Sequence, residues 1–191
     1  MREHTGFLRN VMIRVGKNTD EIMVNIITNQ EDKKALNPIV ESLIEKFPSI
    51  TSIVNNITAQ KSGVSIGEHQ VVLHGNEYMM EKLGKYEFMI SADSFFQTNT
   101  HQAEKLYDIV LEESELTGKE IVYDLFCGTG SISLYISKYA KMVYGFELVM
   151  SAVQDAMQNT ANNKVKNVWF FAGNIENLFL VNPEVKDLDL P

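Results

Sequence analysis

The fold of this chain is decided by the stretch IVYDLFCGTGS, which runs from Ile121 to Ser131. A β-branched and aromatic run ends in an acid at Asp124, a turn containing Gly128 and Gly130 follows, and an amphipathic segment opens at Ser131. This order predicts a parallel strand, a tight loop and the start of a helix, where an open α/β sheet binds a nucleotide-like ligand. The glycines would let the backbone approach that ligand without a Cβ in the way.

The loop does not match the dinucleotide fingerprint, which needs G-x-G-x-x-G to hold a pyrophosphate over the helix end. The third glycine position is Ser133 here. A loop with fewer glycines after an acid suits an uncharged or cationic nucleoside better, and S-adenosylmethionine is such a ligand. Glu147 ends the next apolar run, about 20 residues on, where an acid typically takes the ribose hydroxyls. A strand, turn and helix without any ligand is the alternative.

Composition limits the remaining functions. The chain has 191 residues, of which 45% are hydrophobic and 22% charged, as in ordinary globular proteins. The single cysteine excludes an intrachain disulfide and a Cys-rich metal or iron–sulfur site. No apolar run reaches the roughly 18 residues of a membrane span, and the start lacks a signal-peptide core. We therefore expect a soluble, cytoplasmic protein with no metal, iron–sulfur cluster or membrane partner.

The charge is unevenly distributed. The net charge of −8 argues against general electrostatic capture of nucleic acid. Residues 1–90 carry 10 Lys/Arg and 11 Asp/Glu, whereas residues 91–191 carry 7 and 14. The first half could still present a local basic face, or these could be ordinary solvated charges. The candidates are Arg2, Arg9, Arg14 and Lys17.

Residues 1–90 are predicted to form a small α+β domain. Alternating apolar and polar residues with turn residues between them indicate a hairpin. Apolar residues spaced three and four apart indicate one amphipathic helix, which Pro48 ends, and further strands and a loop follow. The expected strands are 10–15, 21–28, 50–59, 70–73, 78–83 and 86–90, the helix is 34–47 and the loop is 61–67.

Residues 91–191 are predicted to form an α/β domain, half of a doubly wound parallel sheet with a Rossmann-like arrangement. The expected helices are 102–111, 131–139 and 151–162, and the expected strands are 119–125, 142–146 and 167–172. Such a sheet normally continues, so the chain reads as truncated after Phe179. Asn174 follows the third strand, where its amide could read an adenine edge.

The segment SFFQTN, from Ser94 to Asn99, allows two interpretations. In the first, Thr98, Asn99 or Thr100 is the N-cap of the helix and both phenylalanines are core residues. In the second, the amide of Gln97 faces the bound nucleoside and an aromatic ring borders the substrate base.

This segment, the loop DLFCGTG, the GFE that ends at Glu147, and AVQDA with Asn159 together resemble the RNA uracil-C5 methyltransferases. These enzymes make 5-methyluridine in ribosomal and transfer RNA, and the resemblance covers essentially the whole chain. It implies that residues 1–90 face RNA and that S-adenosylmethionine is the cofactor. The residues that it implies in cofactor binding are Gln97, Phe126, Gly128, Gly130, Ser131, Glu147 and Asn174.

The chain also departs from that family. Family chemistry uses a Cys nucleophile that adds to C6 of uracil and a carboxylate that helps to remove the C5 proton. Neither motif is present, and Cys127 lies in the cofactor loop, where a packed thiol is the commoner role. We therefore expect this chain alone to be inactive. The alternatives are a methyltransferase for a small molecule or protein, and a non-catalytic nucleoside- or RNA-binding module.

The linker from Gly84 into the segment with Phe95, Phe96 and Gln97 joins the first domain directly to the expected cofactor site, on the side where open α/β sheets bind ligands. Gln97 is expected beside the loop from Gly128 to Gly130, and the first domain is expected above the pocket as a clamp for RNA.

Overall fold

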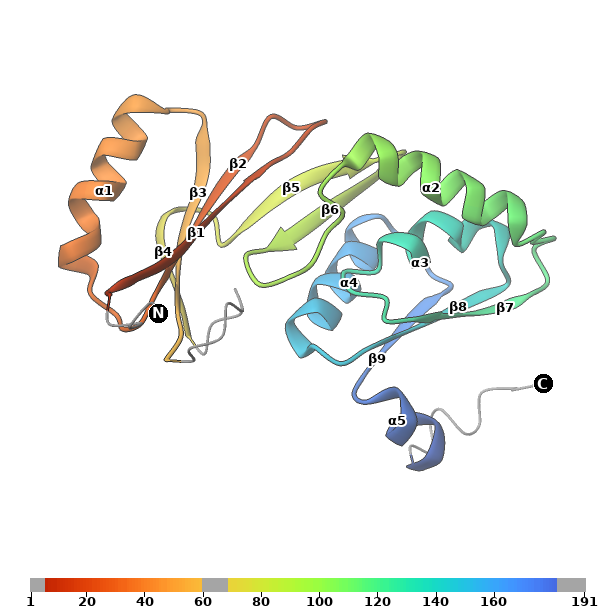
Figure 1. Cartoon of the computed structure of the whole chain (residues 1–191). Coiled ribbons are helices and arrows are strands. Elements are labelled where there is room, and N and C mark those ends of the chain that lie inside the picture. The colour runs from red at the N-terminus through yellow and green to blue at the C-terminus, as the bar shows by residue number, and fades with distance from the viewer. Residues whose placement is uncertain (1–5, 60–68, 182–191) are drawn as a thin grey trace, which may run out of the picture. The chain divides into compact units, whose positions relative to one another are not determined.

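The computed structural model describes residues 6–59 and 69–181, and the chain forms two compact units (Figure 1). The first consists of Met1–Glu81 with Ile90–Asp93, and the second of Lys82–Met89 with Ser94–Pro191. Residues 82–89, which the sequence groups with the first half, therefore belong to the second unit. The predicted loop at 61–67 lies outside the described residues, as does Arg2.

The first unit contains a four-stranded sheet in the order β1-β2-β3-β4. Its strands are β1 (Leu8–Val15), β2 (Ile22–Thr28), β3 (Ile50–Ile57) and β4 (His69–Gly75). The β1–β2 and β3–β4 pairs are antiparallel, as expected for hairpins, whereas β2 and β3 are parallel because α1 (Lys33–Lys46) connects them. The sequence predicted each of these elements to within a few residues.

Helix α1 packs its apolar stripe on one face of this sheet (Figure 1). Asp32 is its N-cap, and the Asp32 side chain accepts a hydrogen bond of 3.0 Å from the N–H of Ala35. The core beneath the helix is wholly apolar and combines residues of α1, β2 and β3: Val24, Ile26, Leu36, Val40, Ile50 and Ile53.

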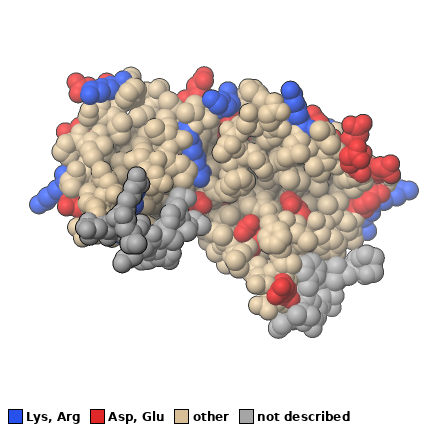
Figure 2. All heavy atoms as spheres, in the orientation of Figure 1, with Lys and Arg blue, Asp and Glu red and all other residues tan. Residues whose placement is uncertain are grey.

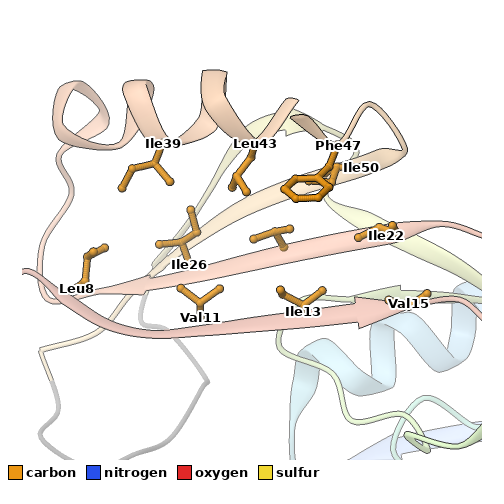
Figure 3. A pocket seen from close by; sticks show the side chains of 11 residues that line it. Leu8, Val11, Ile13, Val15, Ile22, Ile26, Ile39, Leu43, Phe47 and Ile50 are labelled. Carbon is orange, nitrogen blue, oxygen red and sulfur yellow. The ribbon is translucent and has the colours of Figure 1, made fainter. Parts of the chain in front are cut away.

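An apolar groove of about 380 Å³ remains between α1 and the edge strand β1 (Figure 3). In Figure 3, Ile39, Leu43 and Phe47 point from the helix toward the strands. The edge strand contributes Leu8, Val11, Ile13 and Val15, which are all exposed.

Strands β5 (Tyr78–Leu83) and β6 (Tyr86–Ser91) form a separate two-stranded sheet. Gly84 lies in their connection with a φ of +58°, in the left-handed region that glycine adopts most readily. The sequence predicted both strands.

The second unit is built around a parallel three-stranded sheet in the order β7-β8-β9. The sheet strands are β7 (Ile121–Leu125), β8 (Met142–Glu147) and β9 (Val168–Ala172). The helices are α2 (Thr100–Glu113), α3 (Ser131–Ile136), α4 (Met150–Asn162) and α5 (Ile175–Val181). The predicted helix 131–139 ends early, because a 3-10 turn, η1 (Ser137–Tyr139), completes it. Helix α5 was not predicted.

Aromatic rings form much of the core on one side of this sheet. The ring of Phe146 stacks on that of Phe171 at 5.4 Å and on that of Tyr123 at 6.0 Å, and Leu178 of α5 packs against the same cluster. The expected fold class, a Rossmann-like α/β domain preceded by a small α+β domain, is confirmed.

Candidate functional site

The carboxyl ends of the three parallel strands meet at one edge of the sheet. The register pairs Leu125 with Phe146 and Glu147 with Ala172, so the glycine loop, Glu147 and the residues after β9 lie together. The backbone N–H of Cys127 donates to the carbonyl of Phe146 at 3.0 Å, which fastens the loop to the end of β8. This is the edge where open α/β sheets bind ligands.

The loop has an unusual backbone. Phe126, Gly128 and Gly130 have φ angles of +64°, +54° and +76°. A bulky residue in the left-handed region is an outlier that tends to mark a functional site. At Gly130 the need for glycine is also steric, since a Cβ would lie 2.6 Å from Cζ of Phe170.

Glu147 is the most firmly positioned acid at this edge. One carboxylate oxygen accepts from the N–H of Gly128 at 3.0 Å, and the other accepts from the N–H of Val149 at 2.9 Å. A carboxylate oxygen can accept two hydrogen bonds, so each retains capacity for a further donor. The side chain is half-buried and so remains accessible to a ligand.

Asp124 is placed differently. Its carboxylate accepts a hydrogen bond from the hydroxyl of Ser133 at 2.5 Å. Burial raises the pKa of the Asp124 carboxyl above its ordinary value, and the hydrogen bonds from Ser133 partly offset this rise. The chain itself therefore supplies a hydroxyl to this carboxylate, between β7 and α3.

Large apolar side chains are exposed around these polar groups. The exposed fractions are 77% for Phe126, 66% for Phe95 and 64% for Leu148. These residues belong to the glycine loop, the SFFQTN segment and the position after Glu147. Exposed apolar groups beside hydrogen-bonding groups are typical of a ligand site.

The SFFQTN segment is held against the glycine loop. The Ser94 hydroxyl donates to the carboxylate of Asp155 at 2.6 Å, and the Phe95 carbonyl lies 3.9 Å from where a Cβ on Gly128 would be. The segment that carries Gln97, which is half-buried, thus borders the loop. Contact between the Gln97 amide and a ligand stays a prediction.

The first interpretation of this segment is right in part, and the second stays a prediction. Asn99 is the N-cap of α2, because its side chain accepts from the N–H of Gln102 at 3.1 Å. The interpretation of Phe95 as a core residue is wrong, since it is mostly exposed. Phe96 is half-buried, and its ring lies 5.5 Å from that of Phe88.

Two buried polar residues of α4, Asp155 and Asn159, support the site, and no role was predicted for either from the sequence. Asp155 anchors Ser94, as described above. Asn159 donates to the carbonyls of Met89 at 3.1 Å and Thr129 at 3.3 Å, and it accepts from the N–H of Met89 at 2.7 Å. Their spacing of four along one helix face is a signal that sequence reasoning could have used.

The other predicted site residues already have partners within the chain. The Ser131 hydroxyl shares a hydrogen bond of 2.7 Å with that of Tyr107, which ties α2 to the loop. The side-chain oxygen of Asn174 accepts from the N–H of Glu176 at 2.9 Å, and its NH₂ group remains as a donor for a ligand.

Cys127 is not built as a nucleophile. Its side chain is 8% exposed. Burial, and to a lesser extent the charges of Asp124 and Glu147, raise the pKa of the Cys127 thiol well above its ordinary value. The reactive thiolate is therefore disfavoured, and the thiol packs within the loop.

Within residues 6–59 and 69–181, no three or more His, Cys, Asp or Glu side chains are grouped so that they could hold a metal ion. In the same part of the chain, no helix combines the length and apolar character needed to cross a membrane.

A family model described as tRNA (uracil-5-)-methyltransferase matches residues 19–186. An uncharacterized RNA methyltransferase of Chlorobaculum tepidum is 42% identical over 177 residues, which are 92% of this chain and 37% of that protein. One of Staphylococcus aureus is 39% identical over 192 residues, 97% of this chain and 42% of that protein. The chain thus spans about two fifths of the length of these relatives.

Solved structures agree with this match. The tRNA (uracil-54, C5)-methyltransferase of Pyrococcus abyssi, in complex with S-adenosyl-L-homocysteine, superposes with a TM-score of 0.70 at 31% identity, covering 88% of this chain and 40% of that one. Trm5b from Pyrococcus abyssi superposes with a TM-score of 0.55 at 15% identity, and the match covers 91% of this chain and 54% of the Trm5b chain. This similarity shows a shared fold alone.

Proposed function

The chain belongs to the tRNA (uracil-5-)-methyltransferase family, and we propose that it carries the cofactor site of an enzyme that methylates C5 of uridine in RNA. The observation that carries this proposal is the Glu147 carboxylate, which two backbone N–H groups hold beside a glycine loop with acceptor capacity left over. The tRNA methyltransferase of Pyrococcus abyssi, which is 31% identical, was solved with S-adenosyl-L-homocysteine.

S-adenosylmethionine fits the residues present. Glu147 would accept from the ribose hydroxyls, and the NH₂ group of Asn174 would donate to an acceptor on adenine. The exposed ring of Phe126 would cover an apolar part of the ligand, and Gly128 leaves the backbone open to close approach. The bound cofactor would supply the electrophilic methyl group.

RNA is the proposed substrate rather than a small molecule or protein. A methyltransferase for another substrate would share Glu147 and the glycine loop, but it would not need the SFFQTN segment or the first unit. The exposed ring of Phe95 suits a stacking contact with a base. Whether the uridine lies in ribosomal or transfer RNA would be decided by comparing both as substrates of the whole enzyme.

The first unit is the proposed RNA-facing part, though one candidate for its basic face has a structural role. The guanidinium of Arg14 is half-buried and donates to the carbonyl of Ser91 at 2.9 Å. The backbone N–H of Lys17 donates a hydrogen bond to the Glu81 carboxylate at 2.7 Å. The side-chain ammonium of Lys17 takes no part in that hydrogen bond. RNA contact by this unit is a proposal.

Replacing Glu147 with Ala tests the cofactor site. We expect S-adenosylmethionine or its demethylated product to bind the purified chain, and E147A to weaken that binding by about 5- to 150-fold, because two ribose hydroxyls lose their acceptor, roughly 1–3 kcal/mol. Isothermal titration calorimetry measures the change. The control is E112A, which removes an exposed acid of α2. Equal binding by E147A and the unaltered chain would remove Glu147 from the site.

A second experiment concerns turnover. We expect the 191-residue chain alone to transfer no methyl group to RNA, because its single thiol, Cys127, is buried and held protonated. Incubation with methyl-labelled cofactor and unmodified ribosomal or transfer RNA should give no incorporation. Incorporation that C127S abolishes would contradict this expectation and make Cys127 the nucleophile.

A further inference from the structure

The second unit contains a concave site of about 400 Å³ that is rich in lysine. No acidic residue lines it, although residues 91–191 carry twice as many Asp/Glu as Lys/Arg, 14 against 7. We call it the lysine pocket, and its lining residues are Lys85, Tyr86, Ser137, Lys138, Asn163, Lys164, Val165, Lys166 and Asn167.

The lysine pocket is separate from the cofactor site. Lys138 belongs to η1, which precedes β8, and Lys164 and Lys166 belong to the loop that precedes β9. Since parallel strands all begin at the same edge of a sheet, the pocket lies at the amino-terminal edge. The glycine loop and Glu147 lie at the carboxyl-terminal edge.

Two asparagines fix the loops that carry these lysines. The Asn163 side chain donates to the carbonyl of Glu87 at 2.7 Å and accepts from the N–H of Glu87 at 3.0 Å, which fastens the start of β6 to the end of α4. The Asn167 side chain donates to the carbonyls of Ser137 at 2.7 Å and Ala140 at 3.0 Å. These hydrogen bonds thus hold together the three chain segments that line the pocket, residues 85–86, 137–138 and 163–167.

The four ammonium groups are available for a ligand. All four lysines are exposed, and none of them forms an ion pair with a carboxylate of the described residues. The nearby acid Glu87 is paired with Lys82 at 3.1 Å. The ammonium groups of Lys85 and Lys138 lie 4.9 Å and 4.4 Å from the ring centres of Tyr86 and Tyr139. Such contacts leave the positive charge uncompensated.

Elsewhere the second unit carries a concentration of the opposite charge. On the face shown in Figure 2, acidic side chains gather where α2 ends, a part of the sequence that contains Glu112, Glu113 and Glu115. A polyanion would be repelled there and attracted at the lysine pocket.

We propose that the lysine pocket binds backbone phosphates of the RNA substrate, at a part of the RNA remote from the methylated uridine. Lysine ammonium groups bind phosphates as compact point charges, and each neutralised phosphate releases condensed counterions. This inference rests on the proposed function in one respect, namely that the substrate is RNA. The pocket would hold the RNA without reading its sequence.

The test compares two pairs of charge reversals with the same net charge. K164E/K166E alters the pocket, whereas K105E/K119E alters two exposed lysines, one on α2 and one before β7. Binding of a fluorescently labelled tRNA transcript to the 191-residue chain is followed by anisotropy over a range of salt concentrations. We expect K164E/K166E to weaken binding by at least about tenfold and to lower the salt slope by about 2, one unit for each phosphate contact.

The control pair should change the affinity by less than about threefold, because its lysines contact no phosphate. K85E/K138E, on the other two pocket segments, should weaken RNA binding as much as the first pair. Because it leaves the α4–β9 loop unaltered, the same result from both pairs would show that the loss does not come from misfolding of that loop. Equal weakening by pocket and control pairs, an unchanged salt slope, or no RNA binding by the unaltered chain would overturn the proposal. Cofactor titration of the unaltered chain separates the two hypotheses, since RNA binding through the pocket without any cofactor binding would count against the proposed function and leave the pocket proposal standing.

Discussion

Replacing Asn159 with Ala is expected to lower the free energy of unfolding by about 3–5 kcal/mol. The fully buried amide satisfies the N–H and carbonyl of Met89 and the carbonyl of Thr129. Alanine would leave three backbone groups without this partner, and each buried group left unsatisfied costs roughly 1–3 kcal/mol. Urea unfolding followed by circular dichroism measures the loss.

The matched control is Q158A, one position earlier on α4. Gln158 is exposed, and its side chain donates to that of Asn162 on the same helix face at 2.8 Å. Its replacement should change stability by less than about 0.5 kcal/mol. Similar losses for the two variants would mean that the Asn159 amide does not connect β6 to the glycine loop in solution.

Replacing Gly130 with Ala is expected to lower the free energy of unfolding by about 2–5 kcal/mol. The residue has a φ of +76°, where a Cβ costs roughly 1–2 kcal/mol. A Cβ would also lie 2.6 Å from Phe170 and 3.1 Å from Ala156, and displacing such packed groups typically costs about 1–3 kcal/mol. Cofactor affinity should fall as well, because the loop would shift.

Gly118 provides a control that separates the two contributions. Its φ is also positive, +93°, but no heavy atom lies within 4 Å of the position that a Cβ would take. G118A should therefore show the backbone cost alone. The difference between the two variants, measured by the same unfolding experiment, gives the packing cost at Gly130. If G118A costs as much as G130A, close packing against Phe170 is not what requires a glycine in the loop.

The sequence predicted those features that depend on neighbouring residues. Alternation and turn residues located the strands, spacings of three and four located α1 and α4, and Asn99 was among the proposed N-caps. The placement of Glu147 and the glycine loop at one edge of the sheet followed from the rule that parallel strands end at one edge.

The features that were missed depend on distant partners. Asn159 bonds to residues 70 and 30 positions away, so its spacing from Asp155 on α4 could indicate a shared face but not these partners. The hydrogen bond between Ser133 and Asp124 depends on how α3 returns over β7. Helix α5 is short and follows a glycine and an asparagine that favour a loop, so its packing on Phe146 was not visible in the sequence.

The interleaving of the two units has a consequence for biosynthesis. The chain passes from one unit to the other after Glu81, Met89 and Asp93, so no single cut divides it into two intact parts. Domains usually fold in turn as they leave the ribosome, the N-terminal one first. Here the first unit is complete only once residue 93 has emerged, and by then residues 82–89 have emerged ahead of nearly everything against which they pack. Residues 82–89 therefore acquire most of their partners in the second unit only after the last residue of the first unit has been synthesised.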